Sequence, residues 1–483
     1  MRASPTGTWT RSVVISIAPP RVGLVPGVAI RARPADSRPI AEGGDAMTRR
    51  LLAAPCAALA LLLAPRAFAA PAVPPDGDVV QAYQYLVARL VSLQQEQQDV
   101  QAAGMRWNEL AHRPADDVAA LDPEPELVVS DAWIAVDAKS CTTLEVPRID
   151  GRWWSVQAVN GWGDTVALVS RRAFPKEPHG RFALCAKGAS AALPAGVRRL
   201  DVPGAKTRVR VRIERGADAA EAVRLQQAFR LAATGAPRIA PAPRAVPFTS
   251  DALPGVEAFD DFDPLLASDP DVAPGMEALQ QKVRAVGVAA RYPKPRERLE
   301  HVIRTQAIPQ LLEAARAIGP VANGWSRAGA SGSDGADFGA RSARALAGIR
   351  PSPDEIALYR ATRDAGGAPL DGAHRYTLTF RKDALPAAHA SDLWSLVALD
   401  AATRRVIPNA LGRYAIGDAS APTPGDDGSL TLWVAATAPP DAPPGNWLPT
   451  LPGQPFELRL RFYGASPDAR AGRASPPPLV RLE

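Results

Sequence analysis

The chain has 483 residues, of which 46% are hydrophobic and 22% are charged, and its formal net charge is +6. This length is ample for two or three domains with real cores. Nine arginines but only three acidic residues lie before residue 70, so the rest of the chain is close to neutral. The chain also has no long basic run interleaved with aromatic residues. Nucleic acid is therefore not an expected partner.

The start of the chain has the pattern of an export signal. Arg49 and Arg50 follow Met47, the apolar stretch 51–64 comes next, and Ala67-Phe68-Ala69 resembles a cleavage site. We therefore expect a signal peptide over 47–69, cleaved near Ala69, and a periplasmic or secreted protein. The apolar stretch is too short to span a bilayer, so an integral membrane protein is not expected. Residues 1–46 are either an extension from a misplaced start codon or a real, disordered arm.

Cys141 and Cys185 are the cysteines that follow the expected cleavage site. Disulfides persist in the compartments that exported proteins reach. The sequence therefore favours a disulfide between these two residues over the alternative of two buried free thiols.

An N-terminal β-sandwich domain with flanking helices is expected over 76–234. A helical pattern runs from Asp78 to about Arg113, and strand patterns occupy 127–213. Asp150-Gly151 separates two β-rich runs and predicts a hairpin between 142–149 and 152–159.

Two further patterns in this domain are local and clear. Val209, Val211 and Ile213 alternate strictly with arginines, which predicts a strand with one apolar and one basic face. Asp218, with Glu221 three residues later, predicts the capped start of an amphipathic helix.

The rest of the chain is expected to contain a connecting region and a second β domain. Residues 235–335 combine a Pro-rich linker, a helical segment at about 275–318 and a Gly-rich loop that includes 329–335. Residues 336–483 predict a C-terminal β-sandwich. The fold class is therefore α+β and mainly β, with two antiparallel β-sandwich or jelly-roll-like domains joined by a helical segment.

The order of motifs in this chain resembles the bacterial DUF1254/DUF1214 proteins, a family of unknown function. The C-terminal motifs are Pro369-Leu370-Asp371-Gly372, Asp427-Gly428, Asn446-Trp447-Leu448-Pro449 and the strand 455–463; the N-terminal ones are Ala82-Tyr83-Gln84-Tyr85 and Asp150-Gly151-Arg152-Trp153-Trp154. The resemblance implies two β-sandwich domains bridged by helices, and export, but no reaction. The chain departs from the family at Pro123-Glu124-Pro125-Glu126-Leu127, where members usually carry a Pro-Asn-Asn-Asp-Thr-like run.

No strong catalytic or cofactor motif occurs. The chain has no H-E-x-x-H, C-x-x-C, P-loop or complete G-x-S-x-G pattern, and its five histidines lack the spacing of a zinc site. Neither a cofactor nor a metal is therefore expected.

Aromatic and polar residues in or beside predicted strands are the candidates for ligand binding. Sugar sites often stack pyranose rings on aromatic faces and orient them with polar groups. The alternative for each aromatic residue is packing in a core, and for each polar residue a structural role at a corner. The candidates are Trp153, Gln157, Trp162, Trp394, Arg413, Tyr414, Asn446 and Trp447.

Two functions remain open at this point. The first is an exported, envelope-associated protein that binds a carbohydrate, a glycoconjugate or an envelope polymer. The second is a glycan-acting hydrolase or lyase with carboxylates between the two β domains, for which Asp164, Asp400 and Asp418 are the candidates. The enzyme requires acidic residues from both domains to meet in one aromatic-lined cleft. The sequence indicates no oligomeric state.

Overall fold

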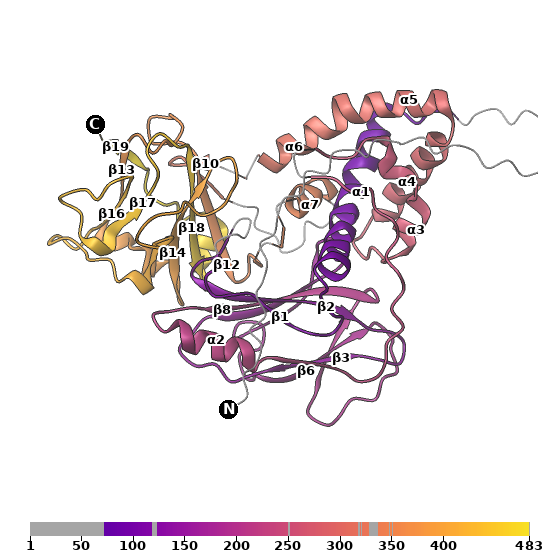
Figure 1. Ribbon diagram of the computed structural model, residues 1–483, viewed down its shortest axis with the longest axis horizontal. Helices are drawn as coiled ribbons and strands as arrows, with labels where there is room; N and C mark the ends of the chain where they lie inside the picture. Colours follow the sequence, from indigo (N-terminus) through magenta and orange to yellow (C-terminus); the bar gives the residue numbers. More distant parts are fainter. Residues whose placement is uncertain are drawn as a thin grey trace, which may run out of the picture. The chain divides into compact units, whose positions relative to one another are not determined.

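The computed structural model describes the chain from residue 72 to residue 482 with short gaps (Figure 1). The expected extension at 1–46, the signal peptide at 47–69 and the Gly-rich loop at 329–335 lie outside the described residues. What is described is α+β and mainly β, as predicted. The described ranges are 72–117, 123–249, 252–316, 319, 321–327, 337–346, 348–349 and 351–482.

The N-terminal sandwich consists of two sheets around one apolar core. Its strands are β1 (Ala111–His112), β2 (Leu127–Ala135), β3 (Thr142–Val146), β4 (Trp154–Val159), β5 (Thr165–Ser170), β6 (Gly180–Ala186), β7 (Arg198–Val202), β8 (Lys206–Glu214) and β9 (Arg230–Ala233). One sheet has the order β1-β2-β8-β4-β5 and the other β7-β6-β3-β9. Val156 and Val209 of the first sheet meet Leu144 and Phe182 of the second in the core.

Strand β8 shows how the sequence pattern becomes a two-faced sheet. Val209, Val211 and Ile213 enter the sandwich core, and the arginines between them point to the opposite face. After β8 the helix α2 (Ala219–Ala228) begins, and the Asp218 side chain accepts a hydrogen bond from the backbone N–H of Glu221. The predicted capped helix is confirmed.

The predicted hairpin at Asp150-Gly151 is wrong. Strand β3 pairs with β6 and β9, whereas β4 pairs with β5 and β8, so the two runs lie in opposite sheets. Pro147 directly follows β3 and cannot donate a backbone hydrogen bond, which ends the ladder there. Gly151 makes its turn at φ 72°, but the chain uses that turn to cross between sheets.

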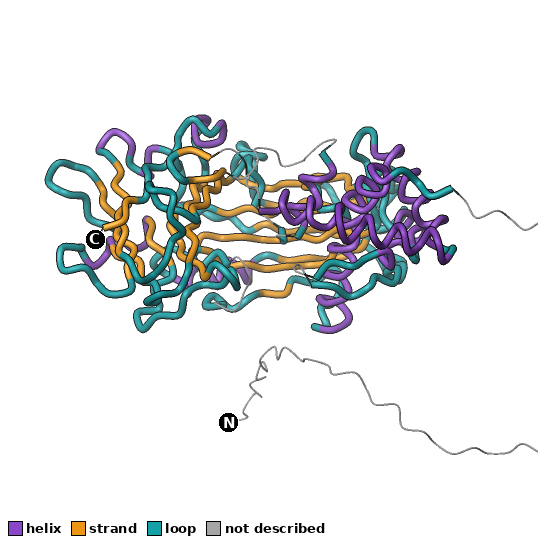
Figure 2. Tube along the Cα trace, turned by 90° about the horizontal axis from the view of Figure 1, so that it is seen from above, coloured by secondary structure: helices purple, strands orange, loops and turns teal. Residues whose placement is uncertain are grey.

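Six helices form a layer with its own core (Figure 2). They are α1 (Asp76–Glu96), α3 (Phe262–Ala267), α4 (Met276–Ala290), α5 (Pro293–Val302), α6 (Ile308–Arg316) and α7 (Phe338–Ala345). Tyr83 and Leu86 of α1 pack with Val283 of α4 and Leu299 of α5. Helix α1 continues only as a π-helix, Gln97–Ala102, and not to Arg113 as predicted, because the chain turns at Gly104 with φ 72°.

The C-terminal sandwich repeats the two-sheet arrangement. Its strands are β10 (Val321–Ala322), β11 (Trp325–Arg327), β12 (Ile356–Ala361), β13 (Arg375–Phe380), β14 (Trp394–Asp400), β15 (Ala415–Gly417), β16 (Leu430–Ala435), β17 (Trp447–Pro449), β18 (Phe456–Tyr463) and β19 (Val480–Leu482). The sheet orders are β10-β11-β12-β18-β14-β15 and β17-β16-β13-β19. A final helix, α8, spans Pro467–Ala471.

The structure differs from the predicted domain limits at residue 336. Strands β10 and β11 precede that residue but belong to the six-stranded sheet, and α7 follows it but packs with the helical layer. Short turns of 3-10 helix occur at Val256–Phe259, Lys382–Ala384, Pro386–Ala388, Asp418–Ser420 and Pro444–Asn446, and a π-helical turn at Ile303–Ala307.

Each sandwich also contains one parallel pair, which the antiparallel prediction did not include. Strand β7 runs parallel to β6, and β17 runs parallel to β16. In both cases a segment of irregular chain returns the strand to the same direction, as a parallel connection requires. The segment before β17 contains four prolines at 439, 440, 443 and 444, which cannot join a central ladder.

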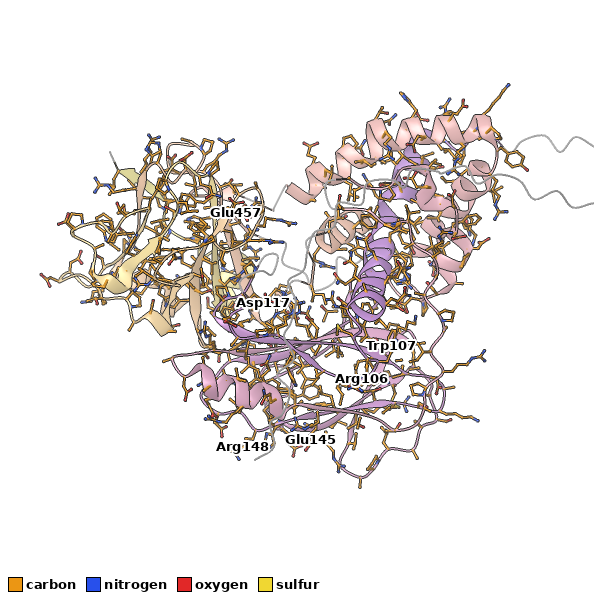
Figure 3. All side chains as sticks on the ribbon, viewed as in Figure 1. Arg106, Trp107, Asp117, Glu145, Arg148 and Glu457 are labelled. Carbon is orange, nitrogen blue, oxygen red and sulfur yellow. A yellow bond between two sulfur atoms is a disulfide. The ribbon has the colours of Figure 1, made fainter. Side chains whose placement is uncertain are left out.

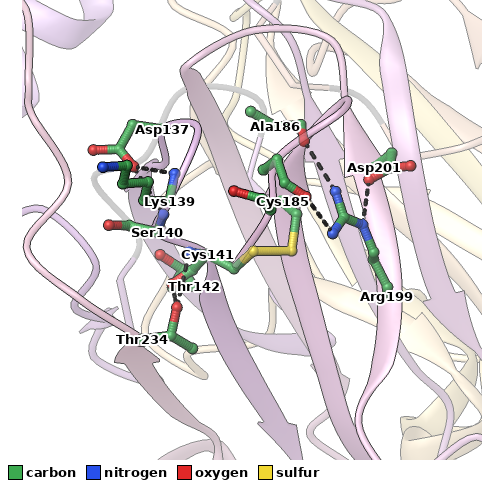
Figure 4. The surroundings of a disulfide bond; sticks show 12 residues. Asp137, Lys139, Ser140, Cys141, Thr142, Cys185, Ala186, Arg199, Asp201 and Thr234 are labelled. Atoms are coloured by element: carbon green, nitrogen blue, oxygen red, sulfur yellow. Dashed lines mark hydrogen bonds and ion pairs between the residues drawn. A yellow bond between two sulfur atoms is a disulfide. The ribbon is translucent and has the colours of Figure 1, made fainter. Parts of the chain in front are cut away.

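Cys141 and Cys185 form a disulfide in the outer sheet of the N-terminal sandwich (Figure 4). The pairing of Thr142 with Leu184 places the two cysteines opposite each other on neighbouring strands. The bond is buried among small residues that include Ala183 and Ala189. In the part of the chain that the structure covers, no helix has both the length and the apolar character needed to cross a membrane.

Candidate functional site

The outward face of β8 carries arginines that are largely covered and paired. Arg210 donates to Asp131 at 2.8 Å, and Arg113 lies 2.6 Å from the same carboxylate. Burial alone would raise the pKa of Asp131, but the nearby guanidinium groups hold it well below its ordinary value. Asp131 therefore remains charged and anchors two basic side chains.

Arg212 is the most deeply buried member of this row. Its guanidinium donates to Glu124 at 2.8 Å, to the Gln157 side chain at 2.9 Å and to the backbone oxygen of Ile349 at 2.9 Å. Its side chain is 1% exposed. Arg212 is thus a fixed part of the fold, which ties the N-terminal sandwich to the segment before β12.

Arg208, at the other end of the row, differs because it reaches a cavity. Its guanidinium lies 3.2 Å from Asp99, whose carboxylate also accepts a 2.9 Å hydrogen bond from the Trp133 indole. Burial lowers the pKa of Arg208, although an arginine stays protonated at any ordinary pH. Its side chain is 11% exposed, and it lines the cavity described next.

The arginine cleft is a cavity of about 430 Å³ between the helical layer, the face of β8 and strand β12. Four arginines from four different elements line it: Arg208, Arg327, Arg344 and Arg470. Three carboxamide side chains, Gln95, Gln157 and Asn160, also line it. Among the described lining residues there is no Asp or Glu. The cleft therefore presents positive charge and hydrogen-bond donors to whatever enters it.

The helical wall of the arginine cleft has a different character from the sheet wall. It is built mainly from small and aliphatic side chains of α1, α6 and α7. These are Ala88, Val91, Ala314, Ala315, Ala340, Ala343, Ala345 and Leu346. Ile356 and Leu358 of β12 continue the apolar surface. The cleft thus joins an apolar wall to a polar one.

Helix α7 is held against the cleft by buried polar contacts. Arg341, with 1% of its side chain exposed, pairs with Asp271 at 2.8 Å and with Asp164 at 3.2 Å. The Ser342 hydroxyl donates to the backbone oxygen of Gln84 in α1. Asp164 also lies 3.7 Å from Arg344, so it positions one of the arginines that line the cleft.

A second cavity, the junction groove, lies where the two sandwiches meet and measures about 410 Å³. Glu214 and Arg215 line it from the N-terminal sandwich, and Tyr414 and Asp418 from the C-terminal sandwich. Burial raises the pKa of Glu214, and the negative charges of Asp418 and Asp392 raise it further. Burial also raises the pKa of Asp418.

Each of these two carboxylates is fixed by the backbone of a tryptophan. Glu214 accepts from the N–H of Trp153 at 2.9 Å, and Asp418 accepts from the N–H of Trp394 at 2.8 Å. Each bond uses one carboxylate oxygen. The arrangement places two partly desolvated carboxylates, one from each sandwich, in the same groove.

Glu126 connects the two sandwiches beside this groove. Its Oε1 atom accepts from Ser395 at 2.7 Å, from Arg461 at 3.0 Å and from the Tyr463 hydroxyl at 2.5 Å. The Glu126 side chain is 7% exposed. Sequence reasoning missed this residue as a functional or structural group, although it lies in the stretch 123–127 that departs from the expected family pattern.

Two family models match the chain, each described as a protein of unknown function: DUF1254 over residues 107–233 and DUF1214 over residues 355–467. The chain is a DUF1254/DUF1214 protein. Each match falls on one sandwich, so the strands β2 to β8 lie in the DUF1254 domain and β12 to β18 in the DUF1214 domain.

Two solved structures resemble the chain. The VPA0106 protein from Vibrio parahaemolyticus is 20% identical, with a TM-score of 0.61 over 85% of this chain and 100% of that one. An uncharacterised protein from Burkholderia cenocepacia is 12% identical, with a TM-score of 0.41 over 84% of this chain and 94% of that one. The first likeness shows the fold alone. No curated protein matches the chain.

The three carboxylates predicted as catalytic candidates do not meet. Asp164 of the DUF1254 domain pairs with Arg341, as described above. Asp400 accepts from the backbone N–H groups of Ala402 and Thr403; burial would raise its pKa, but these hydrogen bonds lower it. Asp418 alone lines the junction groove, where its acidic neighbour is Glu214. The Glu214–Asp418 pairing joins residues about 200 positions apart, a separation that no local pattern reveals.

The predicted tryptophans occupy packing positions. Trp162 is fully buried in the helical core, 4.8 Å from the ring of Tyr85. Trp153 is 2% exposed and packs edge-on against Tyr463 at 4.8 Å, between the DUF1254 and DUF1214 domains. Trp394 is 3% exposed and belongs to the core of the DUF1214 domain.

The remaining candidates divide between structure and cavities. Asn446 is 2% exposed and donates to backbone oxygens of Thr423 and Thr431, and the indole of Trp447 donates to the backbone oxygen of Ala435. Arg413 lines the junction groove but donates to the backbone oxygen of Trp447 at 3.1 Å.

Gln157 and Tyr414 are the remaining candidates. Gln157 lines the arginine cleft but is 3% exposed, and its carboxamide accepts from Arg212 and donates to Thr165 at 2.9 Å. Tyr414 lines the junction groove. Within the described parts of the chain, no group of three or more His, Cys, Asp or Glu side chains could hold a metal ion.

Proposed function

We propose that this DUF1254/DUF1214 protein is exported and binds an acidic glycoconjugate in the arginine cleft. The observation that carries the proposal is the composition of the cleft: four arginines, three carboxamides and no acidic residue among its described lining residues. Guanidinium groups recognise carboxylates through paired hydrogen bonds, and carboxamides suit sugar hydroxyls. The export pattern before residue 70 and the Cys141–Cys185 bond support an extracytoplasmic site of action.

The volume of the cleft is consistent with a ligand of this size. Small-molecule sites typically enclose roughly 300–1,000 Å³ and combine an apolar lining with a few placed polar groups. The cleft of about 430 Å³ has both features.

Calorimetric titration of the chain starting at Ala70 tests the proposal. We expect an acidic oligosaccharide, such as an oligogalacturonate, to bind and a neutral galacto-oligosaccharide of the same length not to bind. The substitution Arg470→Gln should weaken binding about tenfold, since a charged hydrogen bond contributes roughly 1.5 kcal/mol or more. Arg148→Gln is the matched control, because Arg148 is exposed and lies outside the cleft (Figure 3). Equal affinity for acidic and neutral sugars would contradict the proposal.

A second candidate function is a glycan-acting hydrolase or lyase at the junction groove. The observation that favours it is the meeting of Glu214 and Asp418, one from each sandwich, in one groove that also holds Tyr414. A raised pKa keeps a carboxyl group protonated closer to neutral pH, as a general acid requires. Glycosidases commonly use two carboxylates in this way.

Mass spectrometry of sugars released from envelope polysaccharides tests the second candidate. Release should disappear with Glu214→Gln and with Asp418→Asn. It should persist with Asp400→Asn, because Asp400 caps a turn and does not line the groove. No release from any polymer by the unaltered chain would eliminate the enzyme and leave the binding function.

A further inference from the structure

The two walls of the arginine cleft suggest a ligand with two different halves. The sheet wall brings Gln157, Asn160 and Arg208, whereas α1, α6 and α7 bring mainly alanine and aliphatic side chains. Val91, Ala315 and Leu346 are only partly buried although they pack on the helical core. Apolar surface left open beside arginines is costly in water, and its usual role is to contact an apolar ligand.

We propose that the helical wall receives a hydrocarbon chain, so that the ligand is an anionic amphiphile: a glycolipid or glycoconjugate with one acyl or alkyl chain and an acidic head. This inference rests on the proposed function and specifies its ligand class. The acidic head lies against the arginines, and the chain lies along the alanine-rich surface of α6 and α7. The ligand is bound without a covalent bond to the protein.

The residue types of the helical wall fit a chain better than a ring. Ala314, Ala315, Ala340 and Ala345 leave a smooth surface without hydrogen-bonding groups, on which a linear chain can lie at any rotation about its axis. Strand β12 completes the surface from the other side. Its Leu358 lies on the face opposite the sandwich core, which Ala357 and Tyr359 enter.

The charges of the cleft separate this ligand from other amphiphiles. Arg327, Arg344 and Arg470 lie on β11, α7 and α8, and so surround the apolar surface together with Arg208. A cationic amphiphile would meet only like charge among the described lining residues. Arg208 and Arg344 already have Asp99 and Asp164 nearby, so a neutral ligand would gain only hydrogen bonds to uncharged acceptors. An acidic head would gain the stronger, charge-assisted hydrogen bonds.

Titration of the full chain with a series of defined probes tests the inference. The probes are glucuronic acid, butyl glucuronide and octyl glucuronide, with glucose, butyl glucoside and octyl glucoside as the neutral counterparts, all below their critical micelle concentrations. We expect affinity to rise about three- to fourfold per buried methylene in the glucuronide series. The glucoside series should remain at least tenfold weaker at each length.

A matched pair of variants locates the chain. Leu358→Gln should flatten the dependence of affinity on chain length in the glucuronide series. Leu411→Gln is the control, because Leu411 is 57% exposed and is not among the residues that line the cleft. Thermal unfolding of both variants checks their folding, and the probe series on the unaltered chain decides the question if Leu358→Gln does not fold.

The outcomes separate the inference from the function on which it rests. Glucuronic acid that binds with no gain from a longer chain overturns the inference and leaves the proposed function standing. Glucosides that bind as well as glucuronides overturn both the inference and the proposed function, because the acidic head would then contribute nothing. No binding of any acidic probe, with or without a chain, overturns both.

Discussion

The two sandwiches use the same strand pattern for different purposes. Strand β8 of the DUF1254 domain and strand β18 of the DUF1214 domain both alternate apolar residues, which enter a core, with arginines, which face outward. In β18, Arg459 and Arg461 are 2% and 3% exposed, and Arg461 pairs with Glu126 of the other sandwich. In β8, Arg208 reaches a cavity.

The groups that pair with each row of arginines decide what the row does. Glu457 of β18 is fully buried and pairs with Arg360 and Arg459, so that end of the row is neutralised inside its own sandwich (Figure 3). The charge of Arg208 is shared with Asp99, and one side of the residue remains open to the cleft. The arginines of β18 therefore hold the fold together, whereas Arg208 of β8 can also bind a ligand.

Removing the carboxylate that pairs with the arginines of β18 should cost the most stability. Glu126→Ala removes the acceptor of Ser395, Arg461 and Tyr463. We expect it to lower the free energy of unfolding by roughly 3–5 kcal/mol, because it leaves a buried guanidinium without this carboxylate. Urea unfolding measures the change. Glu145→Ala, at an exposed position of β3, is the control; a loss below about 1 kcal/mol for Glu126→Ala would refute the structural role.

Removing the Cys141–Cys185 disulfide should destabilise the DUF1254 domain before the DUF1214 domain. Replacing Cys141 and Cys185 by serine should lower the free energy of unfolding by roughly 2–4 kcal/mol, given a sequence separation of 44 residues. The DUF1214 domain contains no cysteine, so the loss should appear first in the DUF1254 domain. Hydrogen exchange with and without a reducing agent locates it. Equal loss of protection in both sandwiches would mean that they unfold as one unit.

A pH titration of stability addresses the β8 row. The pKa of Asp131 is held below its ordinary 3.8 in the folded state, so below about pH 4 the unfolded chain binds more protons. The contribution of Asp131 to stability is therefore present above that pH and is lost as the pH falls further. Denaturant unfolding of the unaltered chain and of Asp131→Asn should differ most at pH 6–7 and converge in acid. A constant difference across this range would show that the charge of Asp131 is not what stabilises the fold.

The smallest effect concerns an arginine outside both rows. Arg413 donates to backbone oxygens near β17 and is partly exposed. Arg413→Ala should change the free energy of unfolding by less than about 1 kcal/mol, as is usual for surface contacts. Thermal unfolding measures it. A loss as large as that of Glu126→Ala would remove the distinction between buried and surface guanidinium groups drawn above.

Features that are set by residues close together in the sequence were predicted correctly. The cap formed by Asp218 with Glu221 and the two faces of β8 are both set by spacing within one element. The α+β class also followed, because segregated strand and helix patterns are summed over many local segments. The Asp150-Gly151 turn marks the limit of this reasoning. A turn signal shows where the chain reverses, but the choice of sheet depends on side chains that arrive from elsewhere.

The candidate sites depended on contacts that no local pattern contains. Trp153 and Trp394 lie in predicted strands, where an aromatic side chain could face a core or a ligand, and the structure buries both of them. The arginine cleft draws lining residues from α1, β8, β11, α7 and α8, which span most of the chain. The alternating arginines of β8 and β18 were the one available signal. That signal indicates a covered or occupied face without saying which.

The strand lengths at the sheet margins have a consequence for self-association. Among the described strands, seven of the eight at the sheet edges are only two to five residues long, as in β1, β10 and β17, and the last of these ends in Pro449. Short edge strands expose few unpaired backbone N–H and C=O groups, so a strand of a second molecule has little to pair with. We therefore expect the folded protein to add few strands from a second molecule at the edges of its sheets.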